Sequence, residues 1–154
     1  MSYKKFLVTG GSGFVGKALI NRLALLSECS VIAPVRDISM SFPLGVRSIP
    51  FTSLDAVFDL SDVLKGVDCV VHAAARVHVM NDVSADPLAA FRKVNVEATL
   101  RLARQAAASG VKRFIFISSI KVNGEGTDSG IAFNADDIPA PIDAYGISKL
   151  EAEQ

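Results

Sequence analysis

The chain has 154 residues, of which 50% are hydrophobic and 21% are charged. This length and composition are typical of one globular domain with a sizeable core, and they exclude a disordered segment. Basic and acidic residues number 16 each, so the net charge gives no indication of binding to nucleic acid or to an anionic membrane.

No apolar run approaches the roughly 18 residues of a membrane-spanning helix, and the first residues lead directly into a strand. We therefore expect no signal peptide, no membrane anchor and a cytoplasmic location. The two cysteines, Cys29 and Cys69, lack metal-ligand spacing, so we expect no metal site. A reducing compartment also argues against a disulfide between them.

Short apolar runs alternate along the chain with segments of helical spacing. In chain order, strands are expected at residues 5–10, 30–35, 49–51 (weakly), 68–74 and 111–119. Helices are expected between them and at the end, at residues 15–26, 54–66, 87–110 and 143–154, with a loop over 123–141. Asp86 followed by Pro87 is a typical helix start, and Gly110 is a typical stop.

The expected strands are nearly continuous apolar runs, which is typical of a parallel sheet covered by helices on both faces. With right-handed crossovers this pattern predicts an α/β fold, a doubly wound parallel sheet of the Rossmann type. Residues 1–154 are expected to form one domain.

The stretch LVTGGSGFVGKAL, residues 7–19, can be read in two frames. One is G-x-G-x-x-G starting at Gly11, which is typical of ordinary dinucleotide-binding dehydrogenases. The other is T-G-x-x-G-x-x-G starting at Thr9, the spacing of the short-chain dehydrogenase/reductase superfamily. In either frame, glycines between a first strand and a first helix let a pyrophosphate approach the helix N-terminus. The alternative is a glycine-rich turn without a ligand.

Tyr145 and Lys149 are four residues apart and so share one face of the last helix. A tyrosine with the reference pKa of about 10 is a poor base at neutral pH, but a nearby ammonium stabilises the phenolate. Ser118 and Ser119 end an expected strand, where open α/β sheets place their ligand sites. A hydroxyl there could hold the substrate oxygen whose proton Tyr145 exchanges; the alternative is an exposed helical pair beside ordinary serines.

Asn95 lies on the apolar face of the helix expected at 87–110, where a polar side chain needs a partner. Two interpretations of Asn95 remain open: it is a core amide bonded to backbone, or it is a residue that supports the site. His72 lies in a buried strand, and we expect it to pack or to bond to backbone rather than to act as an acid or base.

Together these residues resemble the extended short-chain dehydrogenase/reductases, specifically the NAD-dependent epimerase/dehydratase family that acts on nucleotide sugars. The resemblance covers essentially the whole chain, through the segments VTGGSGFVG, VDCVVHAAA, KVNVEATLRL, VKRFIFISS and DAYGISKLEAE. It favours the frame that starts at Thr9.

The resemblance implies two sets of functional residues. The catalytic residues are Ser119, Tyr145 and Lys149. The cofactor-binding residues are Thr9, Gly10, Gly13, Phe14, Val15, Gly16, Ala73, Ala74, Asn95 and Ser118, together with Tyr145 and Lys149.

Cofactor choice depends on the end of the second strand, which reads SVIAPVRD. Val35 occupies the position at which family epimerases often carry an aspartate for the ribose of NAD. Arg36 comes next, and a guanidinium suits the 2′-phosphate of NADP. NADP is therefore slightly favoured over NAD, the alternative being that Arg36 stacks on adenine while Asp37 faces solvent or the ribose.

The resemblance implies an NAD(P)-dependent nucleotide-sugar epimerase, like the UDP-glucose or UDP-N-acetylhexosamine 4-epimerases, that transiently oxidises the sugar at C4. A nucleotide-4-keto-sugar reductase would use the same residues, and a catalytically silent nucleotide-binding module is a third reading. Ile120 and Lys121 stand where the family's dehydratases carry an acidic pair, so dehydration is not expected. Asn123 stands where many epimerases of the family carry an aromatic residue, so the identity of the sugar is left open.

In this family most sugar contacts come from a C-terminal half that lies outside these residues. We therefore expect residues 1–154 alone to bind the nucleotide but to lack sugar-nucleotide activity. An exposed sheet edge would favour self-association of this piece, and the resemblance suggests a homodimer.

Overall fold

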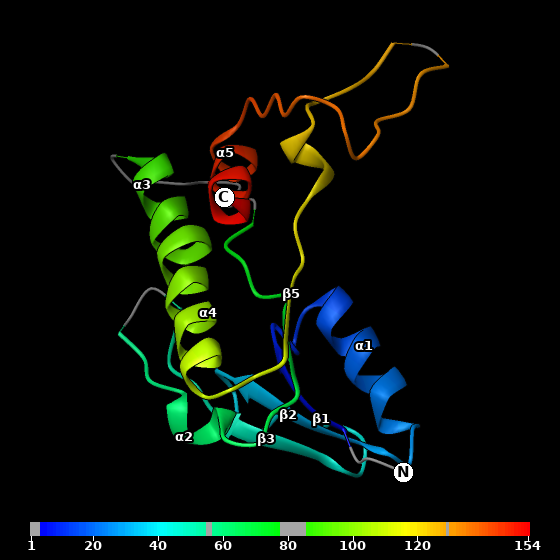
Figure 1. Cartoon of the computed structure of the whole chain (residues 1–154), viewed down its shortest axis with the longest axis vertical. Coiled ribbons are helices and arrows are strands. Elements are labelled where there is room, and N and C mark those ends of the chain that lie inside the picture. The colour runs from blue at the N-terminus through cyan, green and yellow to red at the C-terminus, as the bar shows by residue number, and fades with distance from the viewer. Residues whose placement is uncertain (1–3, 55–56, 78–85, 129) are drawn as a thin grey trace. The chain divides into compact units, whose positions relative to one another are not determined.

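The computed structural model describes residues 4–54, 57–77, 86–128 and 130–154 (Figure 1). Contacts within the chain divide it into two compact units. The sheet unit comprises Met1–Ala75 and Arg101–Ile117, and the helical unit comprises Arg76–Leu100 and Ser118–Gln154.

The sheet unit contains a five-stranded sheet in which every neighbouring pair is parallel. Its strands are β1 (Lys4–Thr9), β2 (Cys29–Val35), β3 (Val46–Pro50), β4 (Cys69–His72) and β5 (Arg113–Phe116). The strand order is β3-β2-β1-β4-β5, so the chain leaves β1 in one direction and returns to its other side with β4. The predicted doubly wound α/β fold is confirmed.

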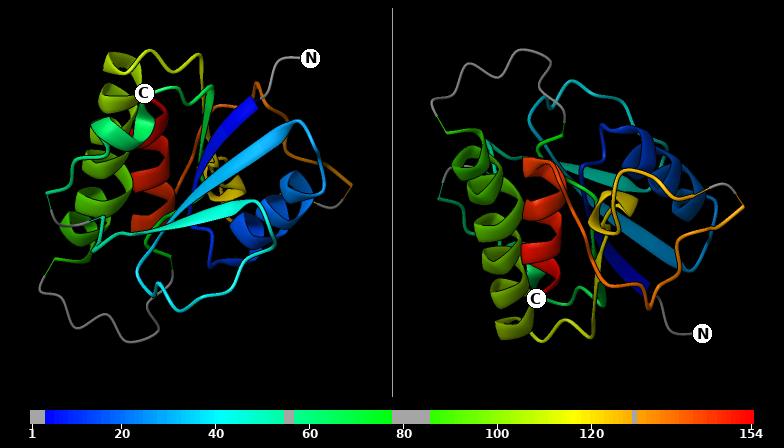
Figure 2. Two further views of the ribbon diagram at one scale, coloured as in Figure 1. Left: turned by 90° about the horizontal axis from the view of Figure 1, so that it is seen from below. Right: turned by 90° about the horizontal axis from the view of Figure 1, so that it is seen from above.

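Helices cover both faces of this sheet (Figure 2). Because successive strand residues point to opposite faces, Leu7 and Val8 belong to different cores. The core containing Leu7 includes residues of α2 (Ser61–Leu64) and of the C-terminal part of α4 (Ala98–Ala108). The core containing Val8 packs against α1 (Phe14–Ala24).

The helical unit contains α3 (Pro87–Arg92), the π-helix η1 (Lys93–Glu97), the start of α4, the short 3-10 helix η2 (Ile120–Val122) and α5 (Ala144–Glu153). The predicted start at Asp86 is confirmed, because its carboxylate accepts a hydrogen bond from Ala89 N at 3.0 Å. Gly110 adopts a φ of 78° just beyond α4, which confirms the predicted stop.

Two predicted helices differ from the structure. The helix expected at 54–66 is reduced to Ser61–Leu64, and residues 55 and 56 lie outside the described part. Gln105 explains part of this difference: its side chain donates to Phe58 O at 2.9 Å and accepts from Leu60 N at 2.9 Å. These bonds occupy backbone groups that a longer helix would need.

The helix expected at 87–110 contains the π-helical turn η1, which its apolar spacing does not indicate. Asn95 lies in this turn, and its carbonyl oxygen accepts a hydrogen bond from the Thr99 hydroxyl at 2.7 Å. The strands expected at 68–74 and 111–119 are shorter at both ends, so Ser118 and Ser119 follow β5 without belonging to it. Within the described ranges, no helix is long and apolar enough to cross a membrane.

Candidate active site

The glycine loop joins β1 to α1 in the sheet unit. Gly13 is the N-cap of α1, and its N–H donates to Gly10 O at 2.9 Å. Since glycine offers no side chain to cap the helix, backbone N–H groups of the first turn are left for another acceptor. Phe14 and Val15 follow at the helix start with 94% and 50% of their surfaces exposed.

The loop has no room for side chains at two of its glycines. A Cβ at Gly16 would lie 2.2 Å from Gly10 O. A Cβ at Gly10 would lie 2.7 Å from the backbone of Ala73 and Ala74, and Gly10 also has a φ of 72°. This geometry fits the frame that starts at Thr9, and it fits a backbone cradle for the pyrophosphate of a dinucleotide.

Thr9 fixes the segment that follows β4. Its buried hydroxyl accepts a hydrogen bond from Ala74 N at 3.3 Å and lies 2.7 Å from His72 Nδ1. His72 is fully buried and its ring lies 6.0 Å from the ring of Phe116. The prediction that His72 packs in the sheet is confirmed, and its ring also contacts the Thr9 hydroxyl.

Arg36 and Asp37 follow β2 and are both exposed. The Asp37 carboxylate accepts hydrogen bonds from Ser39 N at 2.9 Å and Ser39 Oγ at 2.6 Å. These bonds lower the pKa of Asp37 below its usual value and keep it ionised. Among the residues that the structure describes, no carboxylate forms an ion pair with Arg36.

In the helical unit, α5 carries Tyr145 and Lys149 one turn apart, as the spacing predicts. Lys149 is only 1% exposed. Burial lowers the pKa of its ammonium to about 8, while the charge of Glu153 acts in the opposite direction. The Tyr145 ring lies edge-on to the ring of Phe91, with centroids 6.2 Å apart.

A buried polar chain connects η1 to α5. Asn95 Nδ2 donates to Ser148 Oγ at 2.9 Å, and Ser148 Oγ donates to Tyr145 O at 2.8 Å. The Asn95 amide also accepts from Arg76 N at 2.8 Å and donates to Arg76 O at 3.0 Å. Asn95 is therefore bonded to backbone, as one of the two alternatives predicts, and also to the helix that carries Tyr145, while its role at the site stays a prediction.

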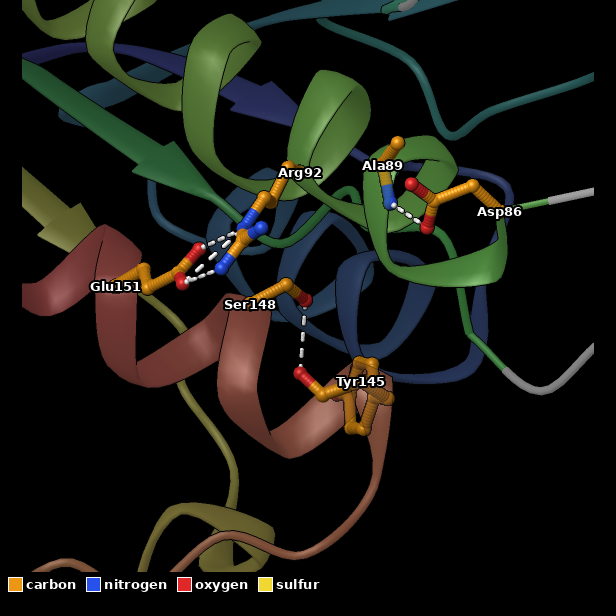
Figure 3. A network of polar contacts seen from close by, with 6 residues as sticks. All are labelled: Asp86, Ala89, Arg92, Tyr145, Ser148 and Glu151. Carbon is orange, nitrogen blue, oxygen red and sulfur yellow. Dashed lines mark hydrogen bonds and ion pairs between the residues drawn. The ribbon is translucent and has the colours of Figure 1, made fainter.

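A second connection lies about one turn further along α5 (Figure 3). The Arg92 guanidinium binds the Glu151 carboxylate through two nitrogens, with Nε–Oε2 at 2.8 Å and Nη2–Oε1 at 2.5 Å. A forked pair of this kind fixes orientation as well as distance. The α5 helix is thus held against α3 and η1 at Glu151 and at Ser148.

The two serines after β5 have different surroundings. Ser119 is the N-cap of η2, and its Oγ accepts a hydrogen bond from Lys121 N at 3.3 Å, which leaves the hydroxyl proton for another acceptor. Ser118 Oγ is buried without a hydrogen-bond partner among the residues that the structure describes. A buried hydroxyl in this state is suited to a ligand that brings its own polar group.

The comparisons with known proteins agree with this geometry. Residues 6–154 match the NAD dependent epimerase/dehydratase family. The chain belongs to this family. A UDP-glucose 4-epimerase from Vibrio cholerae is 48% identical over 98% of the chain and 45% of its own length. A GDP-6-deoxy-D-mannose reductase from Pseudomonas aeruginosa is 31% identical over 97% of the chain and 45% of its own length.

Solved structures share the fold. The protein MoeE5 in complex with UDP-glucose and NAD has a TM-score of 0.80 and 35% identity, over 97% of this chain and 46% of its own. The UDP-glucuronic acid 4-epimerase from Bacillus cereus in complex with NAD has a TM-score of 0.81 and 26% identity, over 97% of this chain and 50% of its own. The chain therefore spans about half the length of the relatives it matches.

Sequence reasoning missed several residues that hold the site together. Ser148 and Arg76 are joined through Asn95, and no local spacing indicates contacts across such separations. Asp143 could have been found, since an aspartate just before a helix is a typical N-cap; its Oδ1 accepts from Gly146 N at 2.6 Å. The catalytic and cofactor-binding roles of the predicted residues remain predictions.

Gly16→Ala is expected to weaken NAD binding by roughly tenfold or more and to lower the free energy of unfolding by about 1–3 kcal/mol, because the loop must move to admit the methyl group. Gly126→Ala is the matched control, since nothing lies within 4 Å of a Cβ at Gly126. Calorimetric titration and denaturant unfolding measure both effects. Equal NAD affinity in the two variants would show that the loop does not hold the cofactor.

Proposed function

We propose that the full-length protein is an NAD(P)-dependent nucleotide-sugar epimerase that acts by transient oxidation at C4 of the sugar. Membership of the family and 48% identity to a UDP-glucose 4-epimerase support this proposal. The observation that carries it is the buried Lys149 one turn from Tyr145, on a helix held by polar contacts at Ser148 and Glu151.

Tyr145 would take the proton of the C4 hydroxyl and later return it. Lys149, whose pKa is about 8, is mainly protonated at neutral pH, and its ammonium would favour the phenolate form of Tyr145. The Ser119 hydroxyl would donate a hydrogen bond to the sugar oxygen. Since Asn95 is bonded to Arg76 and Ser148, it would act by positioning α5.

The residues that would hold the dinucleotide in the sheet unit are Gly10, Gly13 and Gly16, with Ala73 and Ala74 beside them. The nicotinamide, when bound, supplies a hydride acceptor and donor. Complexes of similar proteins with NAD support a dinucleotide of this kind.

A 4-keto-sugar reductase is the second candidate, because a GDP-6-deoxy-D-mannose reductase is among the similar proteins. The two functions differ in their stoichiometry. A reductase consumes one reduced cofactor for each product formed, whereas an epimerase returns the hydride and needs no added reductant.

Tyr145→Phe in the full-length protein is expected to lower kcat by about a hundredfold or more, because the ring stays while the exchangeable proton is lost. NAD affinity should change by less than about threefold, since the hydroxyl is needed for proton transfer more than for binding. Tyr3→Phe makes the same chemical change at the chain's other tyrosine and should retain activity. Turnover of Tyr145→Phe near that of Tyr3→Phe would exclude the proposed role.

We propose a modest preference for NADP, on the basis of Arg36. Its guanidinium is exposed at the end of β2 and could bind a 2′-phosphate through two hydrogen bonds. The ionised Asp37 next to it acts against this preference, because a carboxylate repels the phosphate. The preference should therefore be small.

If Arg36 binds the 2′-phosphate, Arg36→Ala should weaken NADP binding by about tenfold and leave NAD affinity within about twofold. Arg22→Ala removes another exposed arginine of the same unit and should change neither affinity. Calorimetric titration with each cofactor measures both. Tighter binding of NAD by the unmodified protein would show that Arg36 does not select NADP.

A further inference from the structure

Lys121 contacts both segments that carry the proposed catalytic hydroxyls, and it does so through three separate groups. The first is its backbone N–H, which donates to Ser119 Oγ at 3.3 Å. Since Ser119 O also accepts from Val122 N at 3.1 Å, the orientation of Ser119 depends on the turn that Lys121 occupies.

The second group is the Lys121 carbonyl, which lies against the start of α5. A Cβ at Gly146 would lie only 2.7 Å from Lys121 O, so a side chain at this position would push the two backbones apart. Gly146 directly follows Tyr145. The close approach therefore brings the η2 turn against the residue next to the proposed proton acceptor.

The third group is the side-chain ammonium, which forms ion pairs with Glu125 and with Asp143 Oδ2, the latter at 3.6 Å. Asp143 is also the N-cap of α5, through the bond from Gly146 N to its Oδ1. One carboxylate thus binds the Lys121 ammonium with one oxygen and the helix N-terminus with the other. All of these residues belong to the helical unit.

We propose that Lys121 is a positioning residue that fixes the Ser119 hydroxyl relative to the first turn of α5, which carries Tyr145. The inference rests on the proposed function only in assigning chemistry to Ser119 and Tyr145. The local anchoring follows from the contacts themselves and can be measured without turnover.

Contact with Glu125 raises the pKa of the Lys121 ammonium above its usual value. A group whose pKa is raised on folding contributes its stabilisation below the unfolded pKa and loses it only as pH rises through the folded one. The ammonium therefore stays charged throughout the neutral range, so the anchoring should not depend on pH there.

The first measurement is amide hydrogen exchange of the full-length protein. Lys121→Met keeps most of the aliphatic stem but removes the charge, and the amides of Val122 and Gly146 should exchange about tenfold faster. Lys121→Arg should keep them within about threefold of the unmodified protein, because a guanidinium can bind both carboxylates. Lys17→Met, which removes an exposed lysine of α1, is the matched control and should leave them unchanged.

The second measurement is turnover at saturating cofactor. Lys121→Met should lower kcat by about tenfold to a hundredfold, with KM for the sugar nucleotide and NAD affinity within about threefold. Lys121→Arg should restore most of kcat. Adding Glu125→Gln to Lys121→Met should cause little further loss, because both changes remove the same ion pair.

The outcomes separate this inference from the proposed function. Unchanged exchange at Val122 and Gly146 in Lys121→Met would overturn the anchoring, whatever the activity. Faster exchange with unchanged kcat would overturn the positioning role. Absence of turnover in the unmodified protein would contradict the proposed function, while the exchange measurement would still decide on the anchoring. If Lys121→Met does not fold, Lys121→Gln removes the same ammonium and should raise the same two exchange rates.

Discussion

The contact of the glycine loop with its own backbone is the constraint on which the sheet unit depends. Gly10 O occupies the space that a Cβ of Gly16 would need, and Gly10 in turn lies against the backbone after β4. Because these are contacts between backbone atoms, no choice of rotamer can relieve them. They bring the start of α1, the end of β1 and the end of β4 together, where a doubly wound sheet places its ligand.

The helical unit depends on a different kind of interaction. Its central residues are polar and buried, and Asn95, Ser148 and the backbone of Arg76 satisfy one another. Loss of one partner would leave a buried polar group without a hydrogen bond, so such a network specifies one arrangement of its helices. Lys149 adds a charged side chain that burial destabilises, and a group of this kind is more typical of a functional site than of a structural core.

The parallel sheet could be predicted from the sequence because its strands are short apolar runs that alternate with helices, whereas the order of the strands is given by the structure. Helix ends at Asp86 and Gly110 could be predicted because caps are local signals. The glycine loop and the Tyr145–Lys149 pair were found for the same reason, since each is defined by spacing within a few residues.

The remaining features depend on contacts between distant residues. Asn95, in the π-turn, binds Ser148, and Gln105 binds the backbone of Phe58 just before the short α2. Each of these bonds joins residues about fifty positions apart in the sequence. The proposed role of Lys121 could not be predicted for another reason. In the sequence, Lys121 indicates only that the acidic pair of the family's dehydratases is absent. Its contacts with Ser119, Gly146 and Asp143 form only when η2 and α5 are folded together.

Hydride transfer at C4 is tested most directly by following a deuterium placed on that carbon of a UDP-hexose. With the full-length protein and a catalytic amount of cofactor, the C4 epimer should form and keep the deuterium at C4, because the hydride leaves and returns within one site. Mass spectrometry and proton NMR of the product measure this retention. Epimer that has exchanged its deuterium for solvent hydrogen, or product that requires one reduced cofactor per molecule, would contradict the proposed epimerase.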